Sequence, residues 1–110
     1  MTSPSASHQT DPVLARFRCA LEDVYGARLV RAVLYGSRAR GDARPDSDYD
    51  VAVFLREPES LWLEAGRLAE ITTEILDDTG AVINALPFAD DELEARTPLM
   101  CELRRDGRTL

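Results

Sequence analysis

Residues 36–50, GSRARGDARPDSDYD, lie between two apolar segments and hold three arginines and four aspartates. The flanking segments RLVRAVLY (28–35) and DYDVAVFLRE (48–57) are rich in β-branched and apolar residues, which is typical of strands buried on at least one face. Only eleven residues lie between Gly36 and Asp48, fewer than a crossover between parallel strands usually needs. The charged stretch is therefore predicted to connect two antiparallel strands through a loop or a short helix.

Helical patterns and one further strand surround this predicted pair. Asp11 followed by Pro12 is typical of a helix start, and Gly80 is well placed to end a later helix. Pro87 is expected to close the third strand, AVINALPF. The predicted segments are helices at 11–26, 58–78 and 98–106 and a third strand at 81–88.

The connections between these segments indicate the fold class. The helix predicted at 58–78 is long enough to return the chain parallel to the second strand. A small mixed sheet with helices packed on it follows, which is an α/β or α+β fold. The length of 110 residues suits one small domain, and residues 1–10 are Ser/Thr-rich without a hydrophobic period. We expect a disordered tail at 1–10 before a single domain at 11–110.

Composition argues against several classes of partner. The net charge of -7 disfavours a nucleic-acid backbone as the main ligand, because phosphate binding needs a positive surface. The opening MTSPSASHQT lacks the apolar core of a signal peptide, and no run of residues is long and apolar enough to span a bilayer. Cys19 and Cys101 have no CxxC spacing and no nearby histidine, so ordinary reduced cysteines are expected. The sequence predicts a cytoplasmic protein that binds neither nucleic acid nor membrane.

The apolar face of the 58–78 helix carries the only tryptophan. Leu61, Trp62 and Leu63 are adjacent near the start of this helix. Core packing is the expected role of Trp62, and a partner-binding surface is the alternative. The predicted core-facing positions are Leu61, Ala65, Leu68, Ile71 or Thr72, and Ile75.

Two aspartates at the start of the second strand form the first candidate site. Side chains alternate between the faces of a strand, so Asp48 and Asp50 point the same way and Tyr49 points to the other face. Two carboxylates this close repel each other unless a cation lies between them. Mg²⁺ prefers such oxygen ligands and leaves coordination positions open for phosphate. The pair therefore predicts a divalent-metal site.

A phosphate site is predicted at the end of the first strand. Gly36 permits a sharp turn, and Ser37 offers a hydroxyl and an amide where a helix is expected to begin. Arg38, Arg40 and Arg44 lie in the connector, and a guanidinium group matches phosphate oxygens well. Solubility is an equally good explanation of these three arginines.

A calcium-binding loop is a competing motif. Asp46, Asp48, Asp50 and Glu57 stand at positions 1, 3, 5 and 12 of an EF-hand loop. Position 6 requires glycine and is Val51 here, and the residues that follow are typical of a strand where the loop should bend. The metal–phosphate interpretation is therefore preferred.

These motifs resemble those of a known family. Gly36-Ser37, ten further residues and Asp48-Tyr49-Asp50 match the GS-x10-DxD signature of the DNA polymerase β-like nucleotidyltransferases. The length resembles that of the minimal nucleotidyltransferases, which are paired in operons with a helical HEPN protein. The resemblance runs from the first strand through PLMCELRRDG. It implies a polymerase β palm-like fold and the transfer of a nucleotidyl group, commonly AMP from ATP, to a hydroxyl. In antitoxin members, the acceptor is a tyrosine of the HEPN toxin.

The same resemblance implies roles for individual residues. Asp48, Asp50 and Asn84 would form the catalytic set, with two Mg²⁺ ions held by the two aspartates. Gly36 and Ser37 would bind the β and γ phosphates of ATP or another NTP. Arg38 and Arg40 complete the expected nucleotide-binding set.

One position departs from the family pattern. Fully equipped relatives carry a third carboxylate on a later strand, and alignment puts Asn84 there. An amide oxygen can bind a metal but cannot accept a proton, and loss of a general base typically costs roughly 10²- to 10⁴-fold in rate. Two hypotheses follow. One is an antitoxin enzyme that modifies a HEPN-type partner; the other is a weakened or inactive relative that acts as a binding antitoxin or regulatory subunit.

Overall fold

The two apolar segments around the charged stretch form neighbouring antiparallel strands, as predicted. The computed structural model describes residues 11–110 and places β1 (Leu29–Tyr35) beside β2 (Tyr49–Leu55), with Tyr35 opposite Asp50. The connector contains one short helix, α3 (Ser37–Arg40). The tail expected at residues 1–10 lies outside the described part of the chain.

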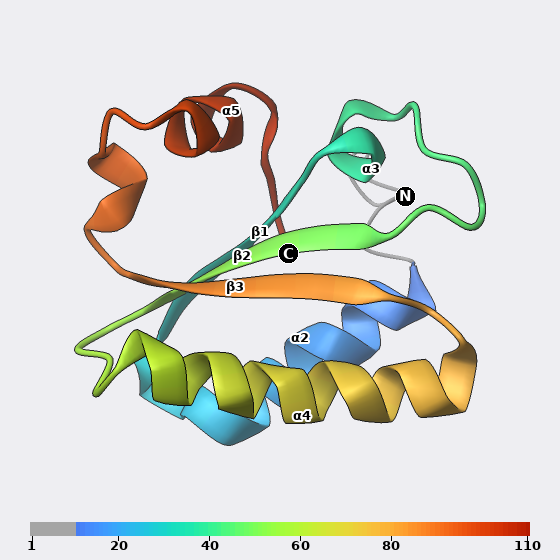
Figure 1. Cartoon of the computed structure of the whole chain (residues 1–110), viewed down its shortest axis with the longest axis horizontal. Coiled ribbons are helices and arrows are strands. Elements are labelled where there is room, and N and C mark those ends of the chain that lie inside the picture. Colours follow the sequence, from blue (N-terminus) through green and yellow to red (C-terminus); the bar gives the residue numbers. More distant parts are fainter. Residues whose placement is uncertain (1–10) are drawn as a thin grey trace, which may run out of the picture.

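The sheet has four strands in the order β3-β2-β1-β4 (Figure 1). β3 (Ile83–Ala89) runs parallel to β2, as the long intervening helix predicts. The strand end predicted at Pro87 is wrong, because β3 continues through this residue to Ala89. β3 is an edge strand, where the missing N–H of proline need not break a ladder. The two-residue β4 (Arg108–Thr109) on the opposite edge was not predicted.

Two helices cover one face of the sheet (Figure 1). They are α2 (Pro12–Tyr25) and α4 (Leu61–Thr79). Asp11 caps α2 by accepting a hydrogen bond from the Val13 N–H at 2.9 Å. Gly80 ends α4 with a φ of 79°, in the left-handed region that glycine favours. The apolar cluster beneath these helices includes Leu14, Phe17, Leu21, Leu34, Val51, Val53, Leu55, Leu68 and Ile75.

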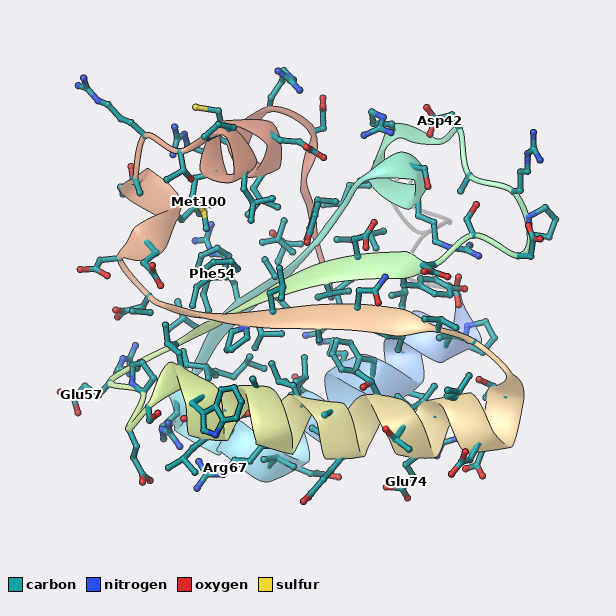
Figure 2. The ribbon with its side chains drawn as sticks, in the orientation of Figure 1. Asp42, Phe54, Glu57, Arg67, Glu74 and Met100 are labelled. Carbon is teal, nitrogen blue, oxygen red and sulfur yellow. The ribbon has the colours of Figure 1, made fainter. Side chains whose placement is uncertain are left out.

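The other face is covered by α5 (Pro98–Asp106) and the 3₁₀ helix Glu92–Glu94, which was not predicted. Figure 2 shows Met100 and Phe54 between α5 and the sheet. These residues share a second apolar cluster with Val33, Ala52 and Leu103. Because both faces of the sheet are buried, the VAVFL segment of β2 is apolar at every position.

The first turn of α4 does not pack as predicted. The core role expected for Trp62 is wrong, because 86% of this residue is exposed, and Leu61 and Leu63 are exposed as well. Glu64 takes the inward position and is fully buried, paired with Arg28 and with Arg67 at 3.0 Å. Burial alone would raise the pKa of Glu64, but hydrogen bonds from the two arginines outweigh it and hold the pKa below its ordinary value.

Two expectations concerned membranes and cysteines. Among the helices of residues 11–110, none has both the length and the apolar character needed to cross a bilayer. Cys19 and Cys101 are both free and exposed.

Candidate active site

Asp48, Asp50 and Asn84 lie together at one end of the sheet. The side-chain amide nitrogen of Asn84 is 3.2 Å from Asp48 Oδ2 and 3.2 Å from Asp50 Oδ1, and donates a hydrogen bond to each. The parallel register pairs Asp50 directly with Asn84, which brings the three side chains to one place. The N–H groups of this amide therefore lie between two carboxylates and offset part of their mutual repulsion.

Tyr49 points to the opposite face of β2, as strand alternation requires. Its ring is buried in the apolar cluster under α2 and α4, and its hydroxyl donates to Asp11 Oδ2 at 2.8 Å. Burial, followed by the hydrogen bond to Asp11 and the charge of that residue, raises the pKa of Tyr49 to about 12. The buried ring anchors the start of β2, so the backbone holds Asp48 and Asp50 on the exposed side.

The turn at Gly36 comes into direct contact with this group. Gly36 has a φ of 74° and a ψ of -155°, a conformation that is essentially restricted to glycine. A Cβ atom on Gly36 would lie 2.7 Å from Asp50 Oδ2, so any side chain there would require the Asp50 carboxylate to move. Ser37 follows at once as the first residue of α3. The missing side chain of Gly36 is what allows the turn and the carboxylate to approach each other.

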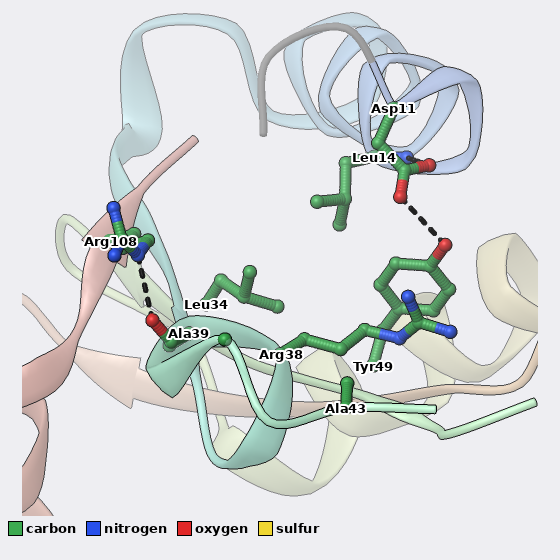
Figure 3. Close-up of a pocket in the computed structure, with 9 residues that line it drawn as sticks. Asp11, Leu14, Leu34, Arg38, Ala39, Ala43, Tyr49 and Arg108 are labelled. Atoms are coloured by element: carbon green, nitrogen blue, oxygen red, sulfur yellow. Dashed lines mark hydrogen bonds between the residues drawn. The ribbon is translucent and has the colours of Figure 1, made fainter. Parts of the chain in front are cut away.

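The arginines of the connector separate into different places. Arg38 stacks on the Tyr49 ring, with its guanidinium carbon 3.8 Å from the ring centre, and donates to Ser47 O at 2.9 and 2.7 Å. Figure 3 shows it beside Tyr49 in a pocket of about 300 Å³. The structure thus does not bring Arg38 to the carboxylates. Arg44 is exposed. Arg40 Nε lies 3.5 Å from Asp42 Oδ2.

Glu102 is a further charged residue at this turn, and sequence reasoning missed it. Its Oε2 accepts a hydrogen bond from the Gly36 N–H at 3.3 Å and lies 3.6 Å from Arg40 Nη1. Burial, followed by the negative charges of Asp50 and Glu102, raises the pKa of Tyr35. Glu102 is 66 residues from Gly36 along the chain, and no local motif marks it.

The oxygen donors at the strand ends suit a magnesium ion. Two carboxylate oxygens, one each from Asp48 and Asp50, lie on either side of the position now taken by the Asn84 amide nitrogen. Rotation of this amide would present its oxygen instead, and Mg²⁺ is commonly held by one or two carboxylates, with water and phosphate completing the shell. Within residues 11–110, no three acidic, histidine or cysteine side chains are arranged to hold a metal. Two carboxylates and an amide oxygen leave coordination positions of Mg²⁺ that water or phosphate oxygens would fill.

Comparison with known proteins gives a family and a set of similar folds. A crystal structure of a toxin–antitoxin with AMP-PNP has a TM-score of 0.56 and 17% identity, covering 86% of this chain and 69% of that one. A mutant of the MntA-HpeT toxin–antitoxin has a TM-score of 0.59 and 17% identity, covering 88% of this chain and 70% of that one. A second MntA-HpeT mutant has a TM-score of 0.53 and 14% identity, covering 86% and 69%.

At these identities, the structural matches show the fold. Comparison with curated proteins gives no match. The sequence model of the nucleotidyltransferase domain matches residues 14–99, which includes the Gly36 turn, both aspartates and Asn84. The chain belongs to the nucleotidyltransferase domain family.

Proposed function

We propose that this chain binds a nucleoside triphosphate with Mg²⁺ and transfers its nucleotidyl group, AMP from ATP, to a hydroxyl of a HEPN-type toxin. One observation carries this proposal. Asp48 and Asp50 both accept hydrogen bonds from the Asn84 amide, and Asp50 touches a turn that only glycine can form. A phosphate-binding turn against a metal-binding carboxylate pair is the arrangement that a metal–triphosphate complex requires.

The residues of the site have separable tasks. Asp48 and Asp50 supply carboxylate oxygens, Ser37 supplies a hydroxyl, and Arg40 supplies a positive charge at the turn. Bound Mg²⁺ would neutralise charge on the triphosphate and on the leaving pyrophosphate. The attacking hydroxyl must lose a proton, which Asn84 cannot accept because an amide has no basic oxygen or nitrogen at neutral pH. That proton would pass to a carboxylate of the pair or to water.

Fold similarity supports the choice of partner. The solved structures reported above are toxin–antitoxin complexes, and one of them was determined with AMP-PNP. A partner that presents a hydroxyl to the open end of the sheet would reach the site, because Asp48 and Asn84 are both exposed there.

Asn84 favours a second candidate function. Its amide donates to both carboxylates, a contact that a third carboxylate could not make. The chain would then be a binding antitoxin or regulatory subunit that holds nucleotide without efficient turnover. The two candidates share the nucleotide site and differ in the rate of the chemical step.

The experiment that tests the proposal follows the label of α-labelled ATP. The wild-type chain with Mg²⁺ is incubated with a lysate of the source organism, and labelled protein bands are quantified. Asp48→Ala/Asp50→Ala should abolish labelling. Asp90→Ala/Asp91→Ala is the matched control, because it removes the same charge beyond the end of β3.

Three results separate the candidates. A band that requires Asp48 and Asp50 supports the enzyme. A band that the Asp48→Ala/Asp50→Ala variant produces equally well contradicts the enzyme. If the wild type binds ATP without labelling any protein, and Asn84→Asp creates labelling, the second candidate is favoured.

A further inference from the structure

The C-terminal helix places a carboxylate on the nucleotide-binding turn. Glu102 Oε2 accepts the Gly36 N–H at 3.3 Å and lies 3.6 Å from Arg40 Nη1. The Glu102 side chain is 31% exposed, so water and ligands can still reach it. Both of its partners, a backbone N–H in a glycine turn and an arginine, are groups that also bind phosphate oxygens.

The packing of α5 fixes where Glu102 lies. Met100 and Leu103, on either side of it in sequence, are buried against Val33, Ala52 and Phe54 of the sheet. Thr97 caps the helix by accepting from the Met100 N–H at 3.2 Å. The contact with Gly36 is therefore made from a helix held by the core, and it is distinct from the ion pairs of long, fully exposed side chains.

Two negative charges, those of Asp50 and Glu102, lie close to this turn. Asp50 and Glu102 are both close enough to Tyr35 for their negative charges to add to the effect of burial on its pKa. A triphosphate brought to Gly36 would meet both carboxylates, but only the Asp48–Asp50 pair shares a position suited to Mg²⁺. Glu102 adds repulsion there without adding a metal ligand, and it pairs with Arg40.

We propose that Glu102 is an internal competitor that occupies the place of a phosphate oxygen at the Gly36 turn and lowers the affinity of the site for triphosphate. Binding of nucleotide displaces the carboxylate and frees Arg40 Nη1 for the phosphates, while Arg40 Nε keeps its 3.5 Å pairing with Asp42 Oδ2. This inference rests on the proposed function, since it concerns the same turn. It adds a regulatory role for α5, because any partner that draws Glu102 away would increase nucleotide affinity.

The test measures binding of AMP-PNP with Mg²⁺ by calorimetry. Glu102→Gln keeps an oxygen that can accept the Gly36 N–H but removes the charge, and Glu102→Ala removes both. Glu94→Gln is the matched control, because it makes the same charge change at an exposed position of the neighbouring 3₁₀ helix. Both Glu102 variants should bind about 3- to 30-fold more tightly than the wild type, as expected for loss of one nearby like charge, and the control should not change.

The outcomes separate this inference from the proposed function. If the wild type binds AMP-PNP and both Glu102 variants bind equally or more weakly, the competitor role is overturned and the nucleotide site stands. If neither the wild type nor any variant binds, the proposed function fails and the competitor role fails with it. Tighter binding by Glu102→Gln, with thermal unfolding like that of the wild type, supports the inference.

Discussion

Replacing Gly36 with alanine tests the contact between the turn and the carboxylate pair. The new Cβ would lie 2.7 Å from Asp50 Oδ2, well inside van der Waals contact. Asp50 would have to turn away, which breaks its pairing with Asn84 and separates the two carboxylates. Alanine is also strained at a φ of 74° and a ψ of -155°.

The two effects of this substitution have different sizes and different readouts. A backbone strain of this kind costs about 1–3 kcal/mol in the free energy of unfolding. In a domain of this length, each kcal/mol lowers the melting temperature by roughly 4–8 °C. Displacing one of two metal-binding carboxylates should lower the affinity for Mg²⁺ and AMP-PNP by at least about 100-fold, because a lost charged ligand costs about 3 kcal/mol or more. Thermal unfolding and calorimetry measure the two effects separately.

Gly26→Ala provides the control for backbone strain. Gly26 has a φ of 54° and a ψ of -125°, and nothing lies within 4 Å of a Cβ atom built there. The control should lose stability and keep nucleotide binding. Undiminished binding by a folded Gly36→Ala variant would refute the account of this turn, and so would an equal loss of binding in Gly26→Ala.

Further predictions concern Asn84, Glu64 and the tyrosines. Asn84→Asp should tighten Mg²⁺ binding by about tenfold or more, as measured by calorimetry, because a third carboxylate replaces an N–H donor. An unchanged affinity for Mg²⁺ would contradict the placement of the metal between these side chains. Glu64→Gln should cost about 2 kcal/mol of unfolding free energy in urea at pH 7, below the roughly 3–5 kcal/mol of a fully buried pair because its arginines are partly exposed. Since the pKa of Glu64 is lowered in the folded protein, its contribution to stability is complete above the ordinary value of 4.5 and is lost as pH falls through the folded value. The stability difference between the wild type and Glu64→Gln should therefore narrow as pH falls below 4.5. Burial and nearby carboxylates raise the pKa of Tyr25 and Tyr49 to about 12, and burial and two carboxylates also raise that of Tyr35. Absorbance should therefore show Tyr25 and Tyr49 un-ionised near pH 10 while the chain is folded, and the stability they contribute should be lost as pH rises from 10 toward 12.

Local patterns in the sequence predicted most of the fold. Asp11-Pro12 begins α2 and Gly80 ends α4 because capping depends on neighbouring residues alone. The short connector predicted antiparallel strands, and the long helix predicted a parallel return. Strand alternation likewise predicted that Asp48 and Asp50 share a face.

The features that the sequence did not predict depend on distant partners. Trp62 lies on the exposed side of α4 because Arg28 and Arg67 stabilise Glu64 in the inward position. Arg38 stacks on Tyr49 in place of turning toward the carboxylates. Neither arrangement follows from spacing along the chain, because each depends on which side chains the sheet brings together.

The sequence patterns that predict structure are weaker at the edges of the sheet. β4 has two residues, too few for a hydrophobic period, and it pairs with β1, a strand far away in the sequence. Glu102 reaches Gly36 through the packing of α5. The part of the candidate site at β2 and β3 was therefore predicted, because residues alternate regularly there. The contact of Glu102 on α5 with the Gly36 turn was missed.

Magnesium-dependent binding of AMP-PNP tests the central claim most directly. Calorimetry on the wild type, on Asp48→Ala/Asp50→Ala and on Asp90→Ala/Asp91→Ala, each with and without Mg²⁺, separates binding at the carboxylate pair from general electrostatics. The account predicts binding that requires Mg²⁺, is lost in Asp48→Ala/Asp50→Ala and is retained in Asp90→Ala/Asp91→Ala. Binding that persists in Asp48→Ala/Asp50→Ala, or that is the same without Mg²⁺, would contradict it.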